Sequence, residues 1–124
     1  MAKLLLVEDD LLLSKMYRQK FEMAGFSTDQ AFDGQQAVDR AKLSKPDIIL
    51  MDVMMPKLNG VEALTRIKSD NTTKNIPVIM LTNLSGTQDA ENALKLGAVS
   101  YLVKSDFTPT EVVAKVKQLL ETKK

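Results

Sequence analysis

The stretch PDIILMDVMMPKLNG, residues 46–60, is the part of the sequence that decides the fold. Its four apolar residues, Ile48–Met51, are followed by a single carboxylate, Asp52, and then by breakers such as Pro56 and Gly60. A short apolar run bounded by turn residues is typical of a strand that is buried on both faces. An isolated carboxylate at the tip of such a strand is costly to bury, so Asp52 calls for a functional explanation.

Other short apolar runs repeat this pattern along the chain. They are residues 4–7, 78–81 and 101–103, with a weaker alternating run at residues 26–32. The longer segments between them carry helical spacing, as in Leu13, Met16, Tyr17, Phe21 and Ala24. The chain therefore alternates strand and helix five times.

Several residues mark where the helices begin and end. Gly25 and Gly97 each follow an apolar helical pattern, in the position that favours a left-handed C-terminal residue. Asn59 and Gly60 open a helix, and Thr108, Pro109 and Glu111 form the capping box of the last one.

This alternation predicts one α/β domain over residues 1–124. Strands that are apolar on both faces belong to a parallel sheet covered by helices on each side. We expect a doubly wound five-stranded parallel sheet of the flavodoxin-like (βα)5 type, with strand order 2-1-3-4-5 and three α/β/α layers.

The composition narrows the chemistry. The 124 residues are 44% hydrophobic and 27% charged, and 17 Lys and Arg nearly balance 16 Asp and Glu, so we expect no direct nucleic-acid binding. There is no Cys and no His, which excludes thiolate zinc sites and imidazole catalysis. The longest apolar runs have four residues, and no secretory signal is apparent at the start, so we expect no membrane insertion and a cytoplasmic location.

Polar residues follow the predicted strands at their carboxyl ends. Ligands of an open α/β sheet bind at this edge, where the winding reverses between strands 1 and 3. The polar residues there are Glu8, Asp9, Asp10, Asp52, Thr82 and Lys104. Clustered carboxylates repel one another and need a counter-ion, and a set of oxygen ligands without His or Cys favours Mg²⁺.

The same set has the parts of a phosphoryl-transfer site. Lys104 offers a positive charge and Thr82 a hydroxyl for a phosphate, and the carboxylate of Asp52 can itself be the nucleophile that forms an acyl phosphate. For Asp10 the sequence is equally compatible with a helix cap and with a metal ligand.

The segments LLLVEDD, DIILMDVMMPKLNG, VIMLT and YLVK, in this order and spacing, resemble the receiver domain of two-component response regulators, of the single-domain type found in chemotaxis. The resemblance runs from Leu4 to about Leu120. It implies that Mg²⁺ is held by Glu8, Asp9, Asp52 and the backbone carbonyl of Met54, and that Asp52 is the phosphoacceptor. It also implies that Thr82 and Lys104 contact the phosphoryl group, and that Thr82 and Tyr101 form the switch. Tyr101 as an ordinary core aromatic remains an equal alternative.

The resemblance also implies a function and partners. A histidine kinase or a histidine phosphotransfer protein would donate the phosphoryl group to Asp52. Phosphorylation would then change the affinity of one surface, formed by the fourth helix, fifth strand and fifth helix, for an unidentified downstream protein. The chain would be a self-phosphorylating signalling switch with autodephosphorylation, not a turnover enzyme, and a monomer or a phosphorylation-dependent homodimer. A receiver-like module that binds proteins without phosphorylation is the alternative. A phosphatase is disfavoured, because Met54 stands where such enzymes place a second acid.

One departure from the family pattern concerns the residue after Lys104. Ser105 stands where the family usually has Pro in a cis peptide bond. A cis bond before a residue other than proline costs roughly 2.5–4 kcal/mol. A trans bond is therefore expected here, in a loop that departs from the family pattern next to Lys104.

Overall fold

The computed structural model describes residues 2–53, 58–82 and 87–122, and the side chains of residues 87–90 and 122 are left out of the description. The strands are β1 (Lys3–Val7), β2 (Ser27–Ala31), β3 (Ile48–Asp52), β4 (Val78–Thr82) and β5 (Ser100–Val103). The helices are α1 (Leu11–Met23), α2 (Gly34–Ser44), α3 (Gly60–Ser69), α4 (Thr87–Lys95) and α5 (Pro109–Thr122), with a short 3₁₀ turn, η1 (Lys104–Asp106), after β5.

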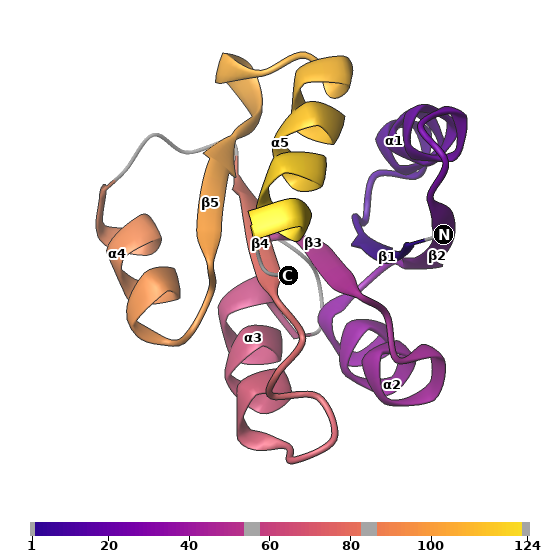
Figure 1. The fold of residues 1–124 in the computed structure, drawn as a ribbon. Helices are drawn as coiled ribbons and strands as arrows, with labels where there is room; N and C mark the ends of the chain where they lie inside the picture. The colour runs from indigo at the N-terminus through magenta and orange to yellow at the C-terminus, as the bar shows by residue number, and fades with distance from the viewer. Residues whose placement is uncertain (1, 54–57, 83–86, 123–124) are drawn as a thin grey trace.

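The strands form one parallel sheet in the order β2-β1-β3-β4-β5, as the sequence predicts (Figure 1). From β1 the chain first adds β2 on one side and then adds β3 on the other side, so the direction of winding reverses between β1 and β3. These two strands are neighbours in the sheet although β2 separates them in the chain. This is the point at which a doubly wound sheet opens a crevice at the carboxyl ends of its strands. The fold is therefore the predicted flavodoxin-like arrangement.

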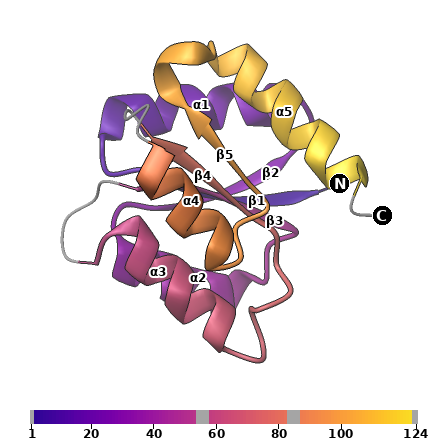
Figure 2. The same ribbon diagram turned by 90° about the vertical axis from the view of Figure 1, so that its left-hand side faces the viewer.

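The sheet separates two apolar layers (Figure 2). Along β1, Leu4 and Leu6 face α1 and α5, whereas Leu5 and Val7 face the layer that contains α2, α3 and Ala93 of α4. Successive side chains of a strand point to opposite faces, so a strand buried on both sides has no room for polar residues. This explains why β1, β3 and β4 are almost continuously apolar.

The helix ends follow the predicted signals. Gly25 and Gly97 have φ angles of 96° and 111°, in the left-handed region that glycine tolerates. In the capping box of α5, Thr108 Oγ1 accepts a hydrogen bond from the Glu111 backbone N–H at 3.2 Å, and Glu111 Oε1 accepts one from the Thr108 N–H at 2.9 Å. These local signals fix the helix boundaries and hence the loops at the two edges of the sheet.

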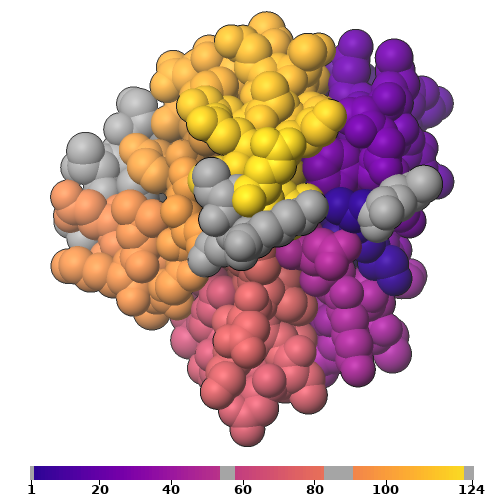
Figure 3. All heavy atoms as spheres, viewed as in Figure 1, coloured from indigo at the N-terminus to yellow at the C-terminus, as the bar shows by residue number. Residues whose placement is uncertain are grey.

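The helix α5 returns across the sheet to the N-terminal part of the chain. In the space-filling view its yellow surface meets the violet surface of the N-terminal segments (Figure 3). Apolar residues of α1 and α5, among them Phe21 and Val116, share one buried cluster. No helix in the described ranges is long and apolar enough to cross a membrane.

Candidate functional site

Strand register places the polar residues of the carboxyl edge at nearly one level. Val7 lies beside Met51 in the sheet, so Glu8 and Asp52 are the next residues of neighbouring strands. Thr82 pairs with Val103, the residue before Lys104. The sheet alone therefore brings together four of the residues that the sequence predicts for the site.

Three carboxylates form the acidic part of the site. One oxygen from each of Glu8, Asp9 and Asp52 lies within 4.8 Å of the others. Glu8 and Asp52 are buried, with exposed fractions of 1% and 4%, and Asp9 is exposed. The acidic group is therefore accessible from the side of Asp9.

Lys104 reaches into this acidic group from the end of β5. Its Nζ lies 2.6 Å from Glu8 Oε1 and 3.1 Å from Asp52 Oδ2. No described peptide bond is cis, so the Lys104–Ser105 bond is trans, as expected without proline. The 3₁₀ turn η1 that begins at Lys104 carries the side chain to the site without the cis bond of the family pattern.

Burial and charge act against each other in this cluster. Burial raises the pKa of Glu8 to about 7, and the charge of Asp52 adds to the rise while Lys104 opposes it. Burial alone would lower the pKa of Lys104, but its hydrogen bond to Glu8 and the charges of both acids raise it overall. Burial also raises the pKa of Tyr17 on α1, whose ring lies within the electrostatic reach of Lys104. Cationic charge close to Glu8 therefore favours the ionised form of this carboxyl group.

Asp10 acts as the cap of α1. Its Oδ1 accepts hydrogen bonds from the backbone N–H groups of Leu12 at 3.0 Å and Leu13 at 3.1 Å. The sequence left capping and metal binding open for Asp10, and the structure supports capping. Asp10 instead serves the site through its own backbone N–H, which donates to Glu8 Oε2 at 3.2 Å.

Thr82 is buried at the end of β4, with 2% of its surface exposed. Helix α4 begins at Thr87, so Thr82 is not its N-cap residue. Tyr101 is partly buried and packs against the apolar layer beneath α2, α3 and α4. Its position fits both a core aromatic and a switch residue. Met54 lies outside the described residues, so its backbone carbonyl remains a prediction.

Gly60 contributes in a way that the sequence did not reveal. A Cβ atom at this first residue of α3 would collide with the backbone carbonyl oxygen of Asp52 and the Cα of Val53. The Gly60 N–H donates to the Val53 carbonyl oxygen at 2.9 Å. The chain therefore folds back tightly behind Asp52, which fixes the backbone that carries this carboxylate. The Asn59-Gly60 signal predicted the helix start but not this contact.

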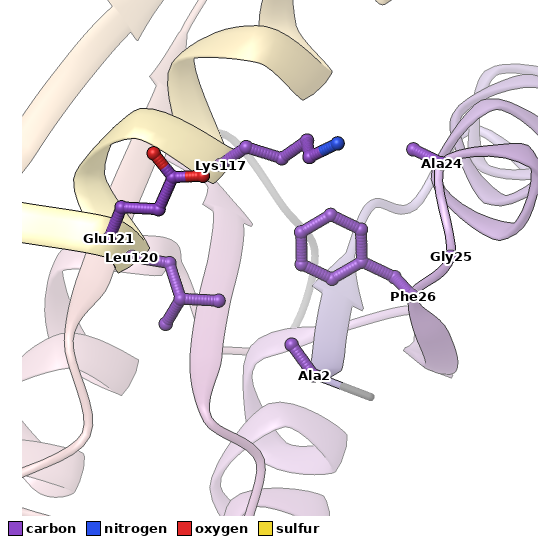
Figure 4. Close-up of a pocket in the computed structure, with 7 residues that line it drawn as sticks. All are labelled: Ala2, Ala24, Gly25, Phe26, Lys117, Leu120 and Glu121. Atoms are coloured by element: carbon purple, nitrogen blue, oxygen red, sulfur yellow. The ribbon is translucent and has the colours of Figure 1, made fainter. Parts of the chain in front are cut away.

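A cavity lies at the opposite edge of the sheet from the acidic group (Figure 4). It encloses about 170 Å³ between the C-terminal ends of α1 and α5. The residues around it are Ala2, Ala24, Gly25, Phe26, Lys117, Leu120 and Glu121. Its floor is apolar, and it contains no group of charges comparable with the one around Asp52.

The acidic group fits a hard divalent cation. Its donors are carboxylate oxygens from two neighbouring strand ends, close enough together to share one ion. Such donors suit Mg²⁺, which takes few protein ligands and keeps several waters. Fold and site together define a flavodoxin-like α/β protein with a cluster of acidic residues and a lysine at its switch point.

Comparison with known proteins agrees with this class. The pattern of the response regulator receiver domain matches residues 4–117. The chain belongs to the receiver domains of two-component response regulators.

Curated relatives include the transcriptional regulatory protein CpxR of Escherichia coli K12, which is 42% identical over 120 residues, 97% of this chain and 50% of CpxR. The DNA-binding dual master transcriptional regulator RpaA of Synechocystis is 38% identical over 97% of this chain and 49% of RpaA. The chain thus spans about half the length of these relatives.

Solved structures share the whole fold. The receiver domain of the Francisella response regulator 1452 aligns with a TM-score of 0.90 and 34% identity over 100% of both chains. The receiver domain of the sensor histidine kinase PA1611 of Pseudomonas aeruginosa PAO1 aligns with a TM-score of 0.81 and 31% identity, over 98% of this chain and 95% of that one. That structure holds a magnesium ion in its active site cleft.

Proposed function

We propose that this receiver domain takes a phosphoryl group onto Asp52 in a Mg²⁺-dependent reaction and works as a signalling switch. One observation carries the proposal. The buried carboxylate of Asp52 lies within 4.8 Å of acidic oxygens from Glu8 and Asp9, and 3.1 Å from the ammonium of Lys104. A nucleophile, a set of hard-metal ligands and a fixed cation thus meet at one point, as phosphoryl transfer requires.

Each residue has a defined part in this reaction. Glu8, Asp9 and Asp52 would hold Mg²⁺, which neutralises charge on the transferred phosphoryl oxygens. Asp52 attacks phosphorus with one carboxylate oxygen, and the electron pair of the breaking bond goes to the leaving group of the donor. Lys104 and the hydroxyl of Thr82 bind phosphoryl oxygens. The backbone carbonyl of Met54 is a further proposed metal ligand.

The donor is proposed to be a histidine kinase or a histidine phosphotransfer protein. These 124 residues contain no histidine, so they cannot themselves supply a phosphohistidine. Leu11 and Leu12, on the first turn of α1 directly after the acidic residues, are 70% and 79% exposed. Two adjacent exposed leucines beside the site offer apolar surface to such a protein.

The output is a population shift between two states of the domain. Phosphorylation draws Thr82 toward the phosphoryl group, Tyr101 follows, and the α4–β5–α5 surface changes its affinity for a downstream protein. Leu94 and Leu96, at the end of α4 and in the connection to β5, are 47% and 37% exposed. They give this surface apolar groups that the sheet does not bury.

The domain is proposed to lose its phosphoryl group by autodephosphorylation and not to turn over a substrate. The acyl phosphate on Asp52 hydrolyses at the same pocket, which resets the switch. A protein-binding module that needs no phosphorylation is the competing function. The complete set of Glu8, Asp9, Asp52, Thr82 and Lys104 disfavours it, because such a module has no use for a buried acidic cluster that costs stability.

Intact-mass spectrometry after incubation with acetyl phosphate, with and without Mg²⁺, tests the proposal. Wild type should gain one phosphoryl group only when Mg²⁺ is present, and Asp52→Asn should gain none. Asp47→Asn is a matched control, because Asp47 is exposed and precedes the same strand at its other end. Asp47→Asn should be phosphorylated like wild type.

Two results would count against the proposal. A wild-type protein that gains no mass with Mg²⁺ would favour the phosphorylation-independent module. A gain that persists in Asp52→Asn would place the acceptor elsewhere in the chain.

A further inference from the structure

The corner between β2 and α2, residues 31–36, contacts the backbone of both segments that carry the acidic group. On one side, the Ala31 carbonyl oxygen accepts a hydrogen bond from the Glu8 backbone N–H at 3.1 Å. On the other side, Gly34, the first residue of α2, is buried and lies against Leu58, in the connection that follows Asp52. The β2–α2 corner therefore bridges the end of β1 and the connection between β3 and α3.

Gly34 allows this close approach because it has no side chain. A Cβ atom at Gly34 would overlap the carbonyl oxygen of Leu58, and it would lie 2.6 Å from the carbonyl carbon and 2.8 Å from the Cβ atom of Leu58. The carbonyl group belongs to the backbone, so no change of side-chain rotamer can relieve the overlap. Any larger residue at Gly34 must therefore move either α2 or the connection between β3 and α3.

The start of α2 is coupled to the acidic group and cannot move independently of it. Asp33 is 6% exposed, and its Oδ1 accepts a hydrogen bond from the Gln36 N–H at 2.8 Å. The Oε1 atom of Gln36 accepts another from the Phe32 N–H at 2.9 Å. These bonds fix the first turn of α2 to the end of β2, where Ala31 is bonded to the Glu8 backbone. A shift of α2 away from the connection would therefore pull on the backbone of Glu8.

Leu58 holds the connection between β3 and α3 against this corner. It is 7% exposed and belongs to the same apolar cluster as Ala31. The connection also contains Met54, whose backbone carbonyl is a proposed metal ligand. An overlap at Gly34 would push the corner and the connection apart, and either movement would increase the separation between Glu8 and this connection.

We propose that Gly34 is a positioning residue that sets the size of the metal site. The close approach of Leu58 keeps the acids that follow β1 and the connection that follows Asp52 at a separation that suits Mg²⁺ better than a larger cation. Mg²⁺ demands near-octahedral geometry with oxygen distances of about 2.0–2.1 Å, whereas Ca²⁺ accepts irregular geometry and distances of about 2.3–2.6 Å. This inference rests on the proposed function, because the metal site itself is proposed there.

The test is the selectivity between Mg²⁺ and Ca²⁺, each titrated alone and followed through amide chemical shifts in NMR spectra of the folded protein. Gly34→Ala should weaken Mg²⁺ binding roughly tenfold, as expected when the support of metal ligands is disturbed. It should weaken Ca²⁺ binding by less than about threefold, because Ca²⁺ tolerates a wider site. The titrations are run at about pH 8.5, above the raised pKa of Glu8, so that the carboxylates are ionised.

Gly25→Ala is the matched control for a general loss of stability. Gly25 has a φ of 96°, and a Cβ atom there would meet no atom within 4 Å, so alanine adds backbone strain without a collision. This strain lies at the opposite edge of the sheet from the acidic group. Gly25→Ala should therefore lose stability and keep the ratio of Mg²⁺ to Ca²⁺ affinity of wild type.

A second pair of variants decides the matter if Gly34→Ala does not fold. Leu58 and Val38 are both 7% exposed and belong to the same apolar cluster, but only Leu58 lies in the connection between β3 and α3. Leu58→Ala loosens that connection and should lower the ratio of Mg²⁺ to Ca²⁺ affinity by roughly threefold, since a loosened support costs less than a displaced one. Val38→Ala should leave the ratio unchanged.

The outcomes distinguish this inference from the proposed function. Wild type that binds Mg²⁺, together with a Gly34→Ala variant whose affinity ratio changes no more than that of Gly25→Ala, would overturn the positioning role and leave the proposed function standing. If Gly34→Ala does not fold, an unchanged ratio in Leu58→Ala would have the same consequence. Wild type that binds no Mg²⁺ at millimolar concentration would overturn both.

Discussion

The two edges of the sheet are built from the same strands but differ in what they bury. At the carboxyl edge, Glu8, Asp52 and Thr82 are almost fully buried, and the two carboxylates share the ammonium of Lys104. At the amino edge, the cavity of Figure 4 is floored by the ring of Phe26, and the charged groups of Lys117 and Glu121 lie on exposed residues of α5.

This difference shows where the chain gives up stability for function. Phe26 packs edge-to-face against Phe21 with ring centroids 5.3 Å apart, an arrangement that adds to stability. Buried carboxylates of like charge do the opposite unless a cation offsets them. The amino edge should therefore tolerate polar substitution poorly, and the carboxyl edge should tolerate neutral substitution well.

The largest expected effect is the difference between Phe26→Ala and Asp52→Asn in the free energy of unfolding, measured in urea. Phe26 is 6% exposed, and removing its ring should lower the free energy of unfolding by about 3 kcal/mol through lost burial and a new cavity. Asp52→Asn removes a buried charge and leaves Lys104 paired with Glu8, so it should change stability by less than about 1 kcal/mol.

Substitutions at the two edges should have the opposite ranking in a phosphorylation assay, where the change at the carboxyl edge should be the more damaging one. Phe26→Leu keeps an apolar side chain at the amino edge and should retain phosphorylation from acetyl phosphate, which Asp52→Asn should lose. A severe loss of stability in Asp52→Asn would mean that the carboxylate is mainly structural and would remove the contrast between the edges.

The sequence predicts those features of the two edges that are encoded by residues close together in the chain. Apolar runs, the glycines at positions 25 and 97 and the Thr108–Glu111 box are local, and the structure confirms all of them. Strand order followed from the alternation, and it placed Glu8 beside Asp52.

Contacts between distant residues were not predictable in this way. The 2.6 Å bond of Lys104 to Glu8 joins residues 96 positions apart and depends on the path of the η1 turn. The fit of Gly60 behind Asp52 also depends on the folded backbone. Ala93 of α4 is buried whereas Leu94 and Leu96 are 47% and 37% exposed, a difference that depends on where the neighbouring elements end and that the apolar character of these residues does not show.

A smaller effect should appear in the pH dependence of stability without Mg²⁺. The folded protein holds a proton on Glu8 up to a pKa of about 7, well above its ordinary value of 4.5. Between these values the folded state binds more protons than the unfolded state, so the stability contributed by Glu8 is present below about pH 4.5 and is lost as the pH rises through about 7.

Glu8→Gln should therefore gain stability relative to wild type as the pH rises through this range, in urea unfolding at a series of pH values. Glu62→Gln, which changes an exposed carboxylate on α3, should run parallel to wild type. A difference between Glu8→Gln and wild type that does not change with pH would show that burial does not hold this proton.

The smallest expected effect concerns Asp70 at the amino edge. Its contribution to stability changes with pH in the opposite direction to that of Glu8. Asp70 ends α3, in the connection that leads to the first residue of β4. Hydrogen bonds from the hydroxyl and N–H of Thr72, together with Lys42, lower its pKa to about 2 from an ordinary value of 3.8. The folded state therefore binds fewer protons than the unfolded state between these values, and the stability from Asp70 is lost as the pH falls through about 2.

Asp70→Asn should be slightly less stable than wild type at neutral pH and equal to it near pH 2, as followed by circular dichroism in urea. The effect should be smaller than that of Glu8, because water screens a partly exposed carboxylate. If the deficit of Asp70→Asn persisted at the lowest pH, it would come from packing and not from charge. The acids of the two edges would then not differ in the sign of their response to pH.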